Sequence, residues 1–196
     1  VVLSMPLHVT QRITETLSSE LSSALADHRS VSTAIVFLAF PKGGVRHPLN
    51  GYGFVVPATE GRHVAAGTFI STKFPNRSPD SHVLMRTFLG GARDSAVLKL
   101  SDDEMVELAR TELGEILGDL PPPTLSRVVR WDDGTPLVEV GHGEKLARLG
   151  RLLKELPGLQ IVANGLRGVG IPDCIADGRR AAREMVEHLT SRRKLQ

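Results

Sequence analysis

The stretch Ile161–Ala182, IVANGLRGVGIPDCIADGRRAA, contains the pattern on which the interpretation of the whole sequence depends. It begins with a short apolar run of the kind found in buried parallel strands. Gly165, Gly168 and Gly170 then predict a turn that another group can approach closely. Pro172 is a residue type favoured at the first helical position, so it predicts the start of a final helix. The free amide groups and the dipole of a helix start favour negative charge.

The spacing of these glycines leaves two interpretations open. They either make a tight connection and nothing more, or they let an anionic ligand approach the helix start. Their order, G-x-x-G-x-G, differs from the dinucleotide-binding fingerprint G-x-G-x-x-G, which does not occur in these 196 residues.

The first residues form a second apolar run, VVLSM, which Pro6 ends. Such an opening is typical of a buried strand and suggests a fragment that starts within one. We therefore expect the strand Val1–Met5 to lie near Gln160–Ala163 in one α/β layer built from both ends of the chain. The predicted fold class is α/β (α+β).

The rest of the sequence predicts a mostly antiparallel sheet with helices. A capping box, Ser101 with Glu104, opens the most distinct helix of the middle region, and the run Pro121–Pro123 follows that helix. Strands are expected over 31–40, 52–56, 63–72, 83–89, 125–131 and 159–163, and further helices over 8–27, over 145–156 and from 172 onward. We assign residues 1–27 and 131–196 to one domain and residues 28–130 to another.

The composition excludes several classes of protein. The 24 basic residues nearly balance the 22 acidic ones, so nothing indicates a nucleic-acid partner. The single cysteine, Cys174, excludes an internal disulfide and fits a reducing, cytoplasmic compartment. No apolar run approaches the roughly 20 residues of a membrane-spanning helix. The seven histidines lack metal-ligand spacing, so no metal site is expected.

Further motifs occur in the order in which one family of flavoproteins has them. They are VVLSMP (1–6), GYGFVVP (51–57), FPNRSPD (74–80), FLGGARD (88–94), LSDDE (100–104), RW (130–131), VEVGH (138–142) and GVGIPDCI (168–175). Together they resemble the carboxy-terminal half of the protoporphyrinogen and coproporphyrinogen oxidases, a branch of the amine-oxidase-like flavoproteins. The resemblance runs along the whole chain, and GVGIPDCI is its most specific piece.

The resemblance implies an FAD cofactor and assigns roles to individual residues. Val169, Gly170 and Ile171 would contact the flavin ring, where the helix start would stabilise the negative charge of reduced flavin. Trp131 would lie on the flavin side, although a lone Trp after an apolar strand is also typical of a core. Phe88 and Leu89 would line the porphyrin pocket, with apolar strand core as an equal alternative.

The resemblance also implies a division of the two domains by function. Residues 1–27 and 131–196 would be the carboxy-terminal part of the FAD-binding domain, and residues 28–130 part of the substrate-binding domain. The segment Thr135–Val138 reads T-P-L-V where the family has I-P-Q-Y, a departure that bears on catalytic competence or on substrate preference.

The predicted function is oxidation of protoporphyrinogen IX or coproporphyrinogen III to the porphyrin with FAD and oxygen, in haem biosynthesis. The predicted partners are the porphyrinogen and an amino-terminal half outside these 196 residues, through which a peripheral membrane contact would be made. Without that half we expect no turnover. The alternatives are a non-catalytic binding or interaction module and another amine-oxidase-like flavoprotein.

Overall fold

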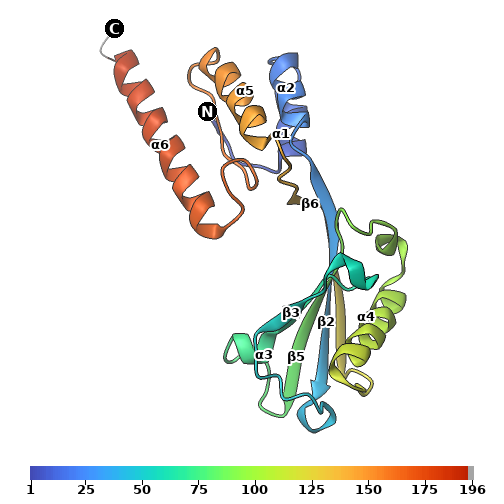
Figure 1. Ribbon diagram of the computed structural model, residues 1–196. Coiled ribbons are helices and arrows are strands. Elements are labelled where there is room, and N and C mark those ends of the chain that lie inside the picture. The colour runs from blue at the N-terminus through green and yellow to red at the C-terminus, as the bar shows by residue number, and fades with distance from the viewer. Residues whose placement is uncertain (194–196) are drawn as a thin grey trace. The chain divides into compact units, whose positions relative to one another are not determined.

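Apolar runs at the two ends and an alternating apolar pattern in the middle give two separate cores. The computed structural model describes residues 1–193 and divides the chain into unit 1, residues 1–31 with those from 133 onward, and unit 2, Ser32–Asp132 (Figure 1). Unit 1 holds β1 (Val2–Leu3), α1 (Leu7–Thr14), α2 (Ser19–Ala26), α5 (His142–Lys154), β7 (Gln160–Ile161) and α6 (Ile171–Arg193). Unit 2 holds β3 (Gly53–Val55), β4 (Ala66–Phe69), α3 (Ile70–Lys73), β5 (His82–Gly90) and α4 (Asp102–Leu117). The strands β2 (Ser30–Pro41) and β6 (Leu125–Pro136) cross the boundary in sequence.

In unit 1 the first strand pairs with the last one, as the apolar runs predict. β1 and β7 are parallel, with Val2 opposite Gln160 and Leu3 opposite Ile161. The Val162 amide continues the ladder by donating to the Leu3 carbonyl at 3.0 Å. The prediction that the two ends of the chain share one layer is therefore confirmed. β7 is shorter than the predicted 159–163, and the turn that follows it begins at Asn164.

The core of unit 1 forms where helices cover this strand pair. Leu21 and Leu25 of α2, Leu149 of α5 and Ile161 of β7 are almost fully buried in one cluster. Burying a side chain of this size stabilises the fold by about 1.5–3 kcal/mol. The helices α1 and α2 lie against each other, and α2 lies against α5.

The predicted single helix over 8–27 is wrong, because the chain breaks between Thr14 and Ser19. Ser18 is in an extended conformation and its hydroxyl accepts the Leu21 amide at 3.2 Å, which caps a second helix. A serine at this position is a standard start signal. The four-residue spacing of Leu17, Leu21 and Leu25 continues across this break, so the apolar pattern did not reveal it.

In unit 2 the strands form one five-stranded sheet in the order β3-β4-β5-β2-β6. β3 with β4, β4 with β5, and β5 with β2 are antiparallel pairs. β6 runs antiparallel to β2 as well, because Thr124 donates to Ala39 before β6 begins and Leu137 donates to Arg29 after it ends. The predicted antiparallel sheet is therefore confirmed.

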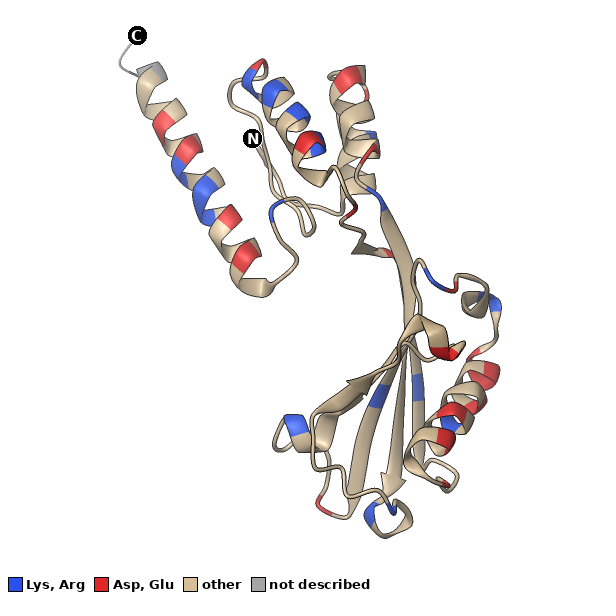
Figure 2. Ribbon diagram, viewed as in Figure 1, with Lys and Arg blue, Asp and Glu red and all other residues tan. Residues whose placement is uncertain are grey.

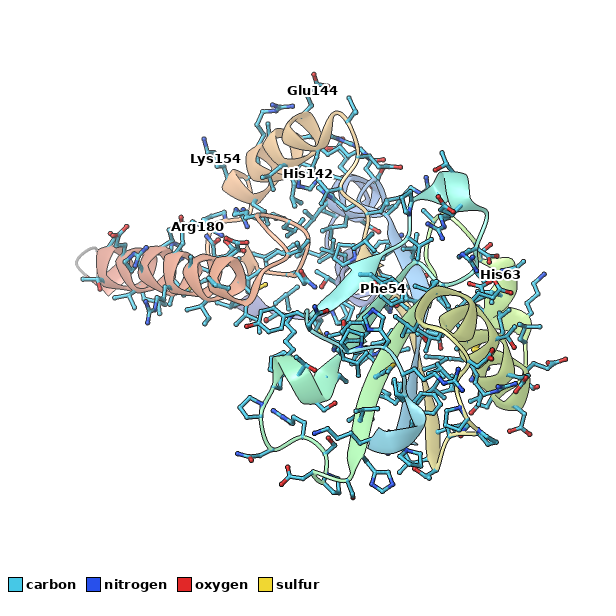
Figure 3. The ribbon with its side chains drawn as sticks, turned by 60° about the horizontal axis from the view of Figure 1, so that its bottom comes forward. Phe54, His63, His142, Glu144, Lys154 and Arg180 are labelled. Carbon is cyan, nitrogen blue, oxygen red and sulfur yellow. The ribbon has the colours of Figure 1, made fainter. Side chains whose placement is uncertain are left out.

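Helix α4 covers one face of this sheet. Its Met105, Ala109 and Leu113 are buried against Val36 and Leu38 of β2. The predicted capping box is present, since Ser101 and Glu104 each bind the other's backbone amide. The acidic residues of α4 lie along the helix, whereas the strands are largely uncharged (Figure 2). The ring of Phe54 packs over Gly67 on β4, where a Cβ would lie 2.6 Å from it (Figure 3).

The predicted strand over 63–72 is shorter in the structure. β4 ends at Phe69, and the short helix α3 takes its place beside β5. The Ser71 hydroxyl accepts the Leu84 amide at 3.0 Å, which replaces a ladder bond of a longer strand. Thr and Ile in this segment have strand propensity, so the sequence pattern did not reveal the change.

Candidate functional site

A cavity of about 260 Å³ lies at the carboxyl ends of the parallel strands of unit 1. Its lining includes Ser4 and Met5 after β1, Ala163 and Asn164 after β7, and Gly134. Open α/β layers bind their ligands at this edge of the sheet, where loops follow the strands. The cavity thus lies where the fold places a ligand.

The glycine turn after β7 is packed against its own chain. A Cβ on Gly165 would lie 2.3 Å from Pro136, and one on Gly168 would lie 2.4 Å from the Cβ of Asp173. Both glycines have positive φ, +90° and +154°. Gly170 is less confined, since its Cβ would meet the Asp173 carboxylate at 3.0 Å. Close packing within the chain therefore explains why residues 165 and 168 are glycines, without any ligand.

The start of α6 exposes apolar side chains beside free amide groups. Val169 is 58% exposed and Ile171 is 78% exposed. The Asp173 carboxylate accepts the Gly170 amide at 3.3 Å. None of the described residues provides an acceptor for the amides of Ile171 and Asp173, which are left for a ligand or water. The three predicted flavin contacts lie together at this helix start.

Cys174, one turn into α6, is exposed. Its amide donates to the Gly170 carbonyl at 3.0 Å, which starts the helical hydrogen bonds. The packed side of α6 is formed instead by Asp177 and Ala181, both nearly fully buried. Arg167 and Arg180 both bind the Asp177 carboxylate and so compensate its burial.

In unit 2 the two predicted pocket residues of β5 lie on opposite faces of the sheet. Leu89 is 1% exposed and belongs to the core beneath α4. Phe88 is half-buried and lies on the other face, opposite Ile35 of β2. We call this the open face: it carries Ile35, Phe37 and Ala39 from β2 and Leu84, Arg86 and Phe88 from β5, all half-buried.

Trp131 of β6 belongs to the open face. Its neighbour Arg130 binds Asp102 and the Leu100 carbonyl at the start of α4, and Val128 packs on the core. Alternate residues of a strand point to opposite faces, so Trp131 points away from α4. It is 54% exposed. Unit 2 therefore brings Trp131 and Phe88 to one face of the sheet, whereas Val169, Gly170 and Ile171 belong to unit 1.

The imidazoles of unit 1 are structural. His142 Nε2 lies 2.7 Å from the Leu166 carbonyl and so connects α5 to the glycine turn. His28, 8% exposed, packs edge-on against His142 at 5.3 Å between ring centroids. Burial, followed by the nearby His142 and Lys145, lowers the pKa of His28. Among the described residues no group of three His, Cys, Asp or Glu is placed to hold a metal ion.

The sequence of this chain was compared with those of known proteins. The family model for flavin-containing amine oxidoreductases matches residues 1–186. The chain belongs to this family. A coproporphyrinogen III oxidase of Bacillus subtilis is 31% identical over 170 residues, which are 86% of this chain and 36% of that protein. The mitochondrial protoporphyrinogen oxidase of Nicotiana tabacum is 31% identical over 164 residues, 82% of this chain and 32% of that protein.

Solved structures agree with the family. A crystal structure from Exiguobacterium sp. 255-15, assigned by name as a protoporphyrinogen oxidase, superposes with a TM-score of 0.77 at 27% identity. It is matched over 97% of this chain and 41% of its own. A redesigned putrescine oxidase has a TM-score of 0.65 at 14% identity, over 95% of this chain and 42% of its own, which shows the fold alone. The chain spans about a third of the length of the curated relatives it matches.

The family implies a flavin, and the residues of unit 1 fit its ring end. The cavity lies at the carboxyl ends of the parallel strands, where α/β layers bind their ligands. The start of α6 offers two free amides between exposed apolar side chains. Amide donors at a helix start suit the anionic edge of a reduced flavin. The described helices include none long and apolar enough to cross a membrane.

Proposed function

We propose that the protein to which this chain belongs is an FAD-dependent oxidase acting in haem biosynthesis. It converts protoporphyrinogen IX or coproporphyrinogen III to the porphyrin, with oxygen as the final acceptor. The observation that carries the proposal is the helix start at Val169–Ile171, in a chain that matches a flavoprotein family over nearly its whole length. The names of the similar proteins supply the substrate class.

In this proposal Val169, Gly170 and Ile171 hold the ring end of FAD. Bound FAD supplies the acceptor for hydride and passes the electrons to oxygen. The exposed side chains of Val169 and Ile171 offer apolar contact to a flat ring. The amides of Ile171 and Asp173 donate toward the ring edge that becomes negative on reduction, and the Asp173 carboxylate moderates this effect by binding the Gly170 amide.

Unit 2 contributes the substrate side, as part of the substrate-binding domain. Phe88 and Trp131 present aromatic rings on the open face, which suits the binding of an apolar macrocycle built of pyrrole rings. Leu89 supports this strand from the core beneath it. The domain roles predicted for 1–27 with 131–196 and for 28–130 remain part of this proposal.

The proposal requires parts of the protein outside this chain. Phosphate-binding glycines of the dinucleotide type are absent from the 196 residues, so the rest of the FAD would be held by an amino-terminal half. That half would also complete the porphyrinogen pocket and provide any peripheral membrane contact, with the protein in the cytoplasm. Leu137 and Val138, in place of the family's Gln-Tyr pair, remove polar groups from the segment next to the cavity and would affect substrate preference.

The proposal is tested with the intact gene product that contains this chain. We expect it to purify with the absorption band of oxidised flavin and to form fluorescent porphyrin from one of the two porphyrinogens in the presence of oxygen. The 196-residue chain mixed with FAD is the control, and we expect no turnover from it. An intact protein that binds no flavin would contradict the proposal and support a non-catalytic module. Turnover of amines or of carotenoid precursors, and not of porphyrinogens, would instead indicate another branch of the family.

A further inference from the structure

The open face of the unit 2 sheet contains an arginine, Arg86, whose charge is not paired with a carboxylate of any described residue. Arg86 lies in the middle of β5, between Leu84 and Phe88, and opposite Phe37 on β2. On its other side it faces Thr68 of β4, which is 9% exposed. The surrounding positions of the open face on β2 and β5 are apolar.

The Nε of Arg86 is buried and has no hydrogen-bond partner among the described residues. Its one contact of note is with the ring of Phe88, whose centroid lies 5.0 Å from the guanidinium carbon. An unsatisfied buried donor is costly, and more so on a charged group. A guanidinium left in this state is suited to an anion that the chain itself does not provide.

The other buried or half-buried charges of unit 2 are satisfied, which makes Arg86 an exception. Glu112 accepts the amides of His63 and Val64 at 3.0 and 2.8 Å. The half-buried Arg62 and Arg110 pair with Glu115 and Glu107. Glu112 and Glu115 hold the segment before β4 to α4, whereas Arg86 has no ion pair with a described residue.

We infer that Arg86 is the carboxylate anchor of a binding surface on the open face, whose ligand is an apolar macrocycle carrying carboxylate side chains. The inference rests on the proposed function and specifies which part of the substrate this chain recognises. Phe88 and Phe37 flank Arg86 and provide aromatic contact, and the guanidinium fork binds a carboxylate in bidentate fashion.

The test measures binding of an oxidised porphyrin, which needs no turnover, to the intact protein. The probes are coproporphyrin and its methyl ester, followed by fluorescence quenching. We expect Arg86→Gln to weaken binding of the free acid by roughly 10- to 100-fold, the effect of one charge-assisted hydrogen-bonded contact, and to leave the ester unchanged. Arg77→Gln is the matched control, because it removes the same charge from an exposed loop of unit 2 and should change neither affinity.

The outcomes separate this inference from the proposed function. Equal affinity of Arg86→Gln and the unchanged protein for the free acid overturns the inference, whatever the turnover. Lower stability of the variant with unchanged affinity also overturns it, because Arg86 would then pair with a carboxylate of the protein. Loss of acid binding in a protein without oxidase activity keeps the inference and overturns the proposed function. If Arg86→Gln does not fold, Arg86→Lys is measured in its place. We expect it to weaken binding of the free acid by less than Arg86→Gln would, and to leave binding of the ester unchanged.

Discussion

Gly168 is the position at which the structure makes the sharpest prediction about the glycine turn. A Cβ there would lie 2.4 Å from the Cβ of Asp173 and 2.7 Å from its Cγ and Oδ2, and the residue has φ of +154°. The Cβ of Asp173 is fixed by the backbone and cannot rotate away, and overpacking of this kind costs about 1–3 kcal/mol. A strained backbone conformation adds about 1–3 kcal/mol. We therefore expect Gly168→Ala to destabilise unit 1 by about 2–6 kcal/mol.

Gly170→Ala is the matched control two residues further along. Its Cβ would lie 3.0 Å from the Oδ2 of Asp173, the end of a side chain that can shift by a few tenths of an ångström. We expect a cost below about 1 kcal/mol, in the range of ordinary glycine substitutions. Both variants thus add a single Cβ to the same turn, but the expected losses in the free energy of unfolding differ.

The assay is urea unfolding followed by circular dichroism, with hydrogen exchange used to assign the change to β1 and β7. Asp173→Gly separates the two contributions, because it removes the three atoms nearest to the new Cβ and leaves the backbone strain. In that background Gly168→Ala should cost only about 1–3 kcal/mol. Equal stability of Gly168→Ala and Gly170→Ala would refute the reasoning.

Three other predictions concern packing and charge. Ser101→Ala should lower the free energy of unfolding of unit 2 by about 1 kcal/mol in urea titrations, because α4 loses its cap, and an unchanged midpoint would contradict this. Asp177→Ala should cost about 1.5–3 kcal/mol in the same assay, since it removes the carboxylate that Arg167 and Arg180 share, and an unchanged midpoint would refute a structural role. Because the pKa of His28 is lowered in the folded chain, His28 of the unfolded chain binds a proton at higher pH than His28 of the folded chain. The free energy of unfolding should therefore be full above about pH 6.5 and fall as the pH drops below it. His28→Phe should flatten that fall, and an identical acid profile would contradict the assignment.

One prediction concerns the cofactor in the intact protein. If the flavin ring lies against Gly170, Gly170→Val should weaken flavin binding by roughly 5- to 150-fold, as an overpacking cost of about 1–3 kcal/mol implies. The exposed Cys174 serves as the control, since Cys174→Ser should leave flavin affinity unchanged. Flavin titration of both variants measures these affinities. An unchanged flavin affinity of the Gly170→Val variant would place the flavin elsewhere.

Local signals in the sequence determined much of the fold. The capping box of Ser101 and Glu104 predicted α4 because capping involves only neighbouring residues. The apolar runs at the two ends predicted the pairing of β1 with β7, since strands buried on both faces leave that pattern. The glycine turn and Pro172 predicted the start of α6 within one residue. The motifs that resemble the porphyrinogen oxidases indicated the family that the comparison confirmed.

Only the tertiary structure decided which of these residues share a surface. Phe88 and Leu89 are equally apolar neighbours, and packing of α4 on one face buried Leu89 and left Phe88 beside Arg86. Arg86 itself gave no signal in the sequence, because a cation in an apolar strand is informative only when its neighbours prove to lack an anion. Periodicity and propensity describe a residue through its neighbours in the chain. The charges, faces and free hydrogen-bond donors that form a site are brought together by contacts between distant strands and helices, and those contacts exist only in the folded chain.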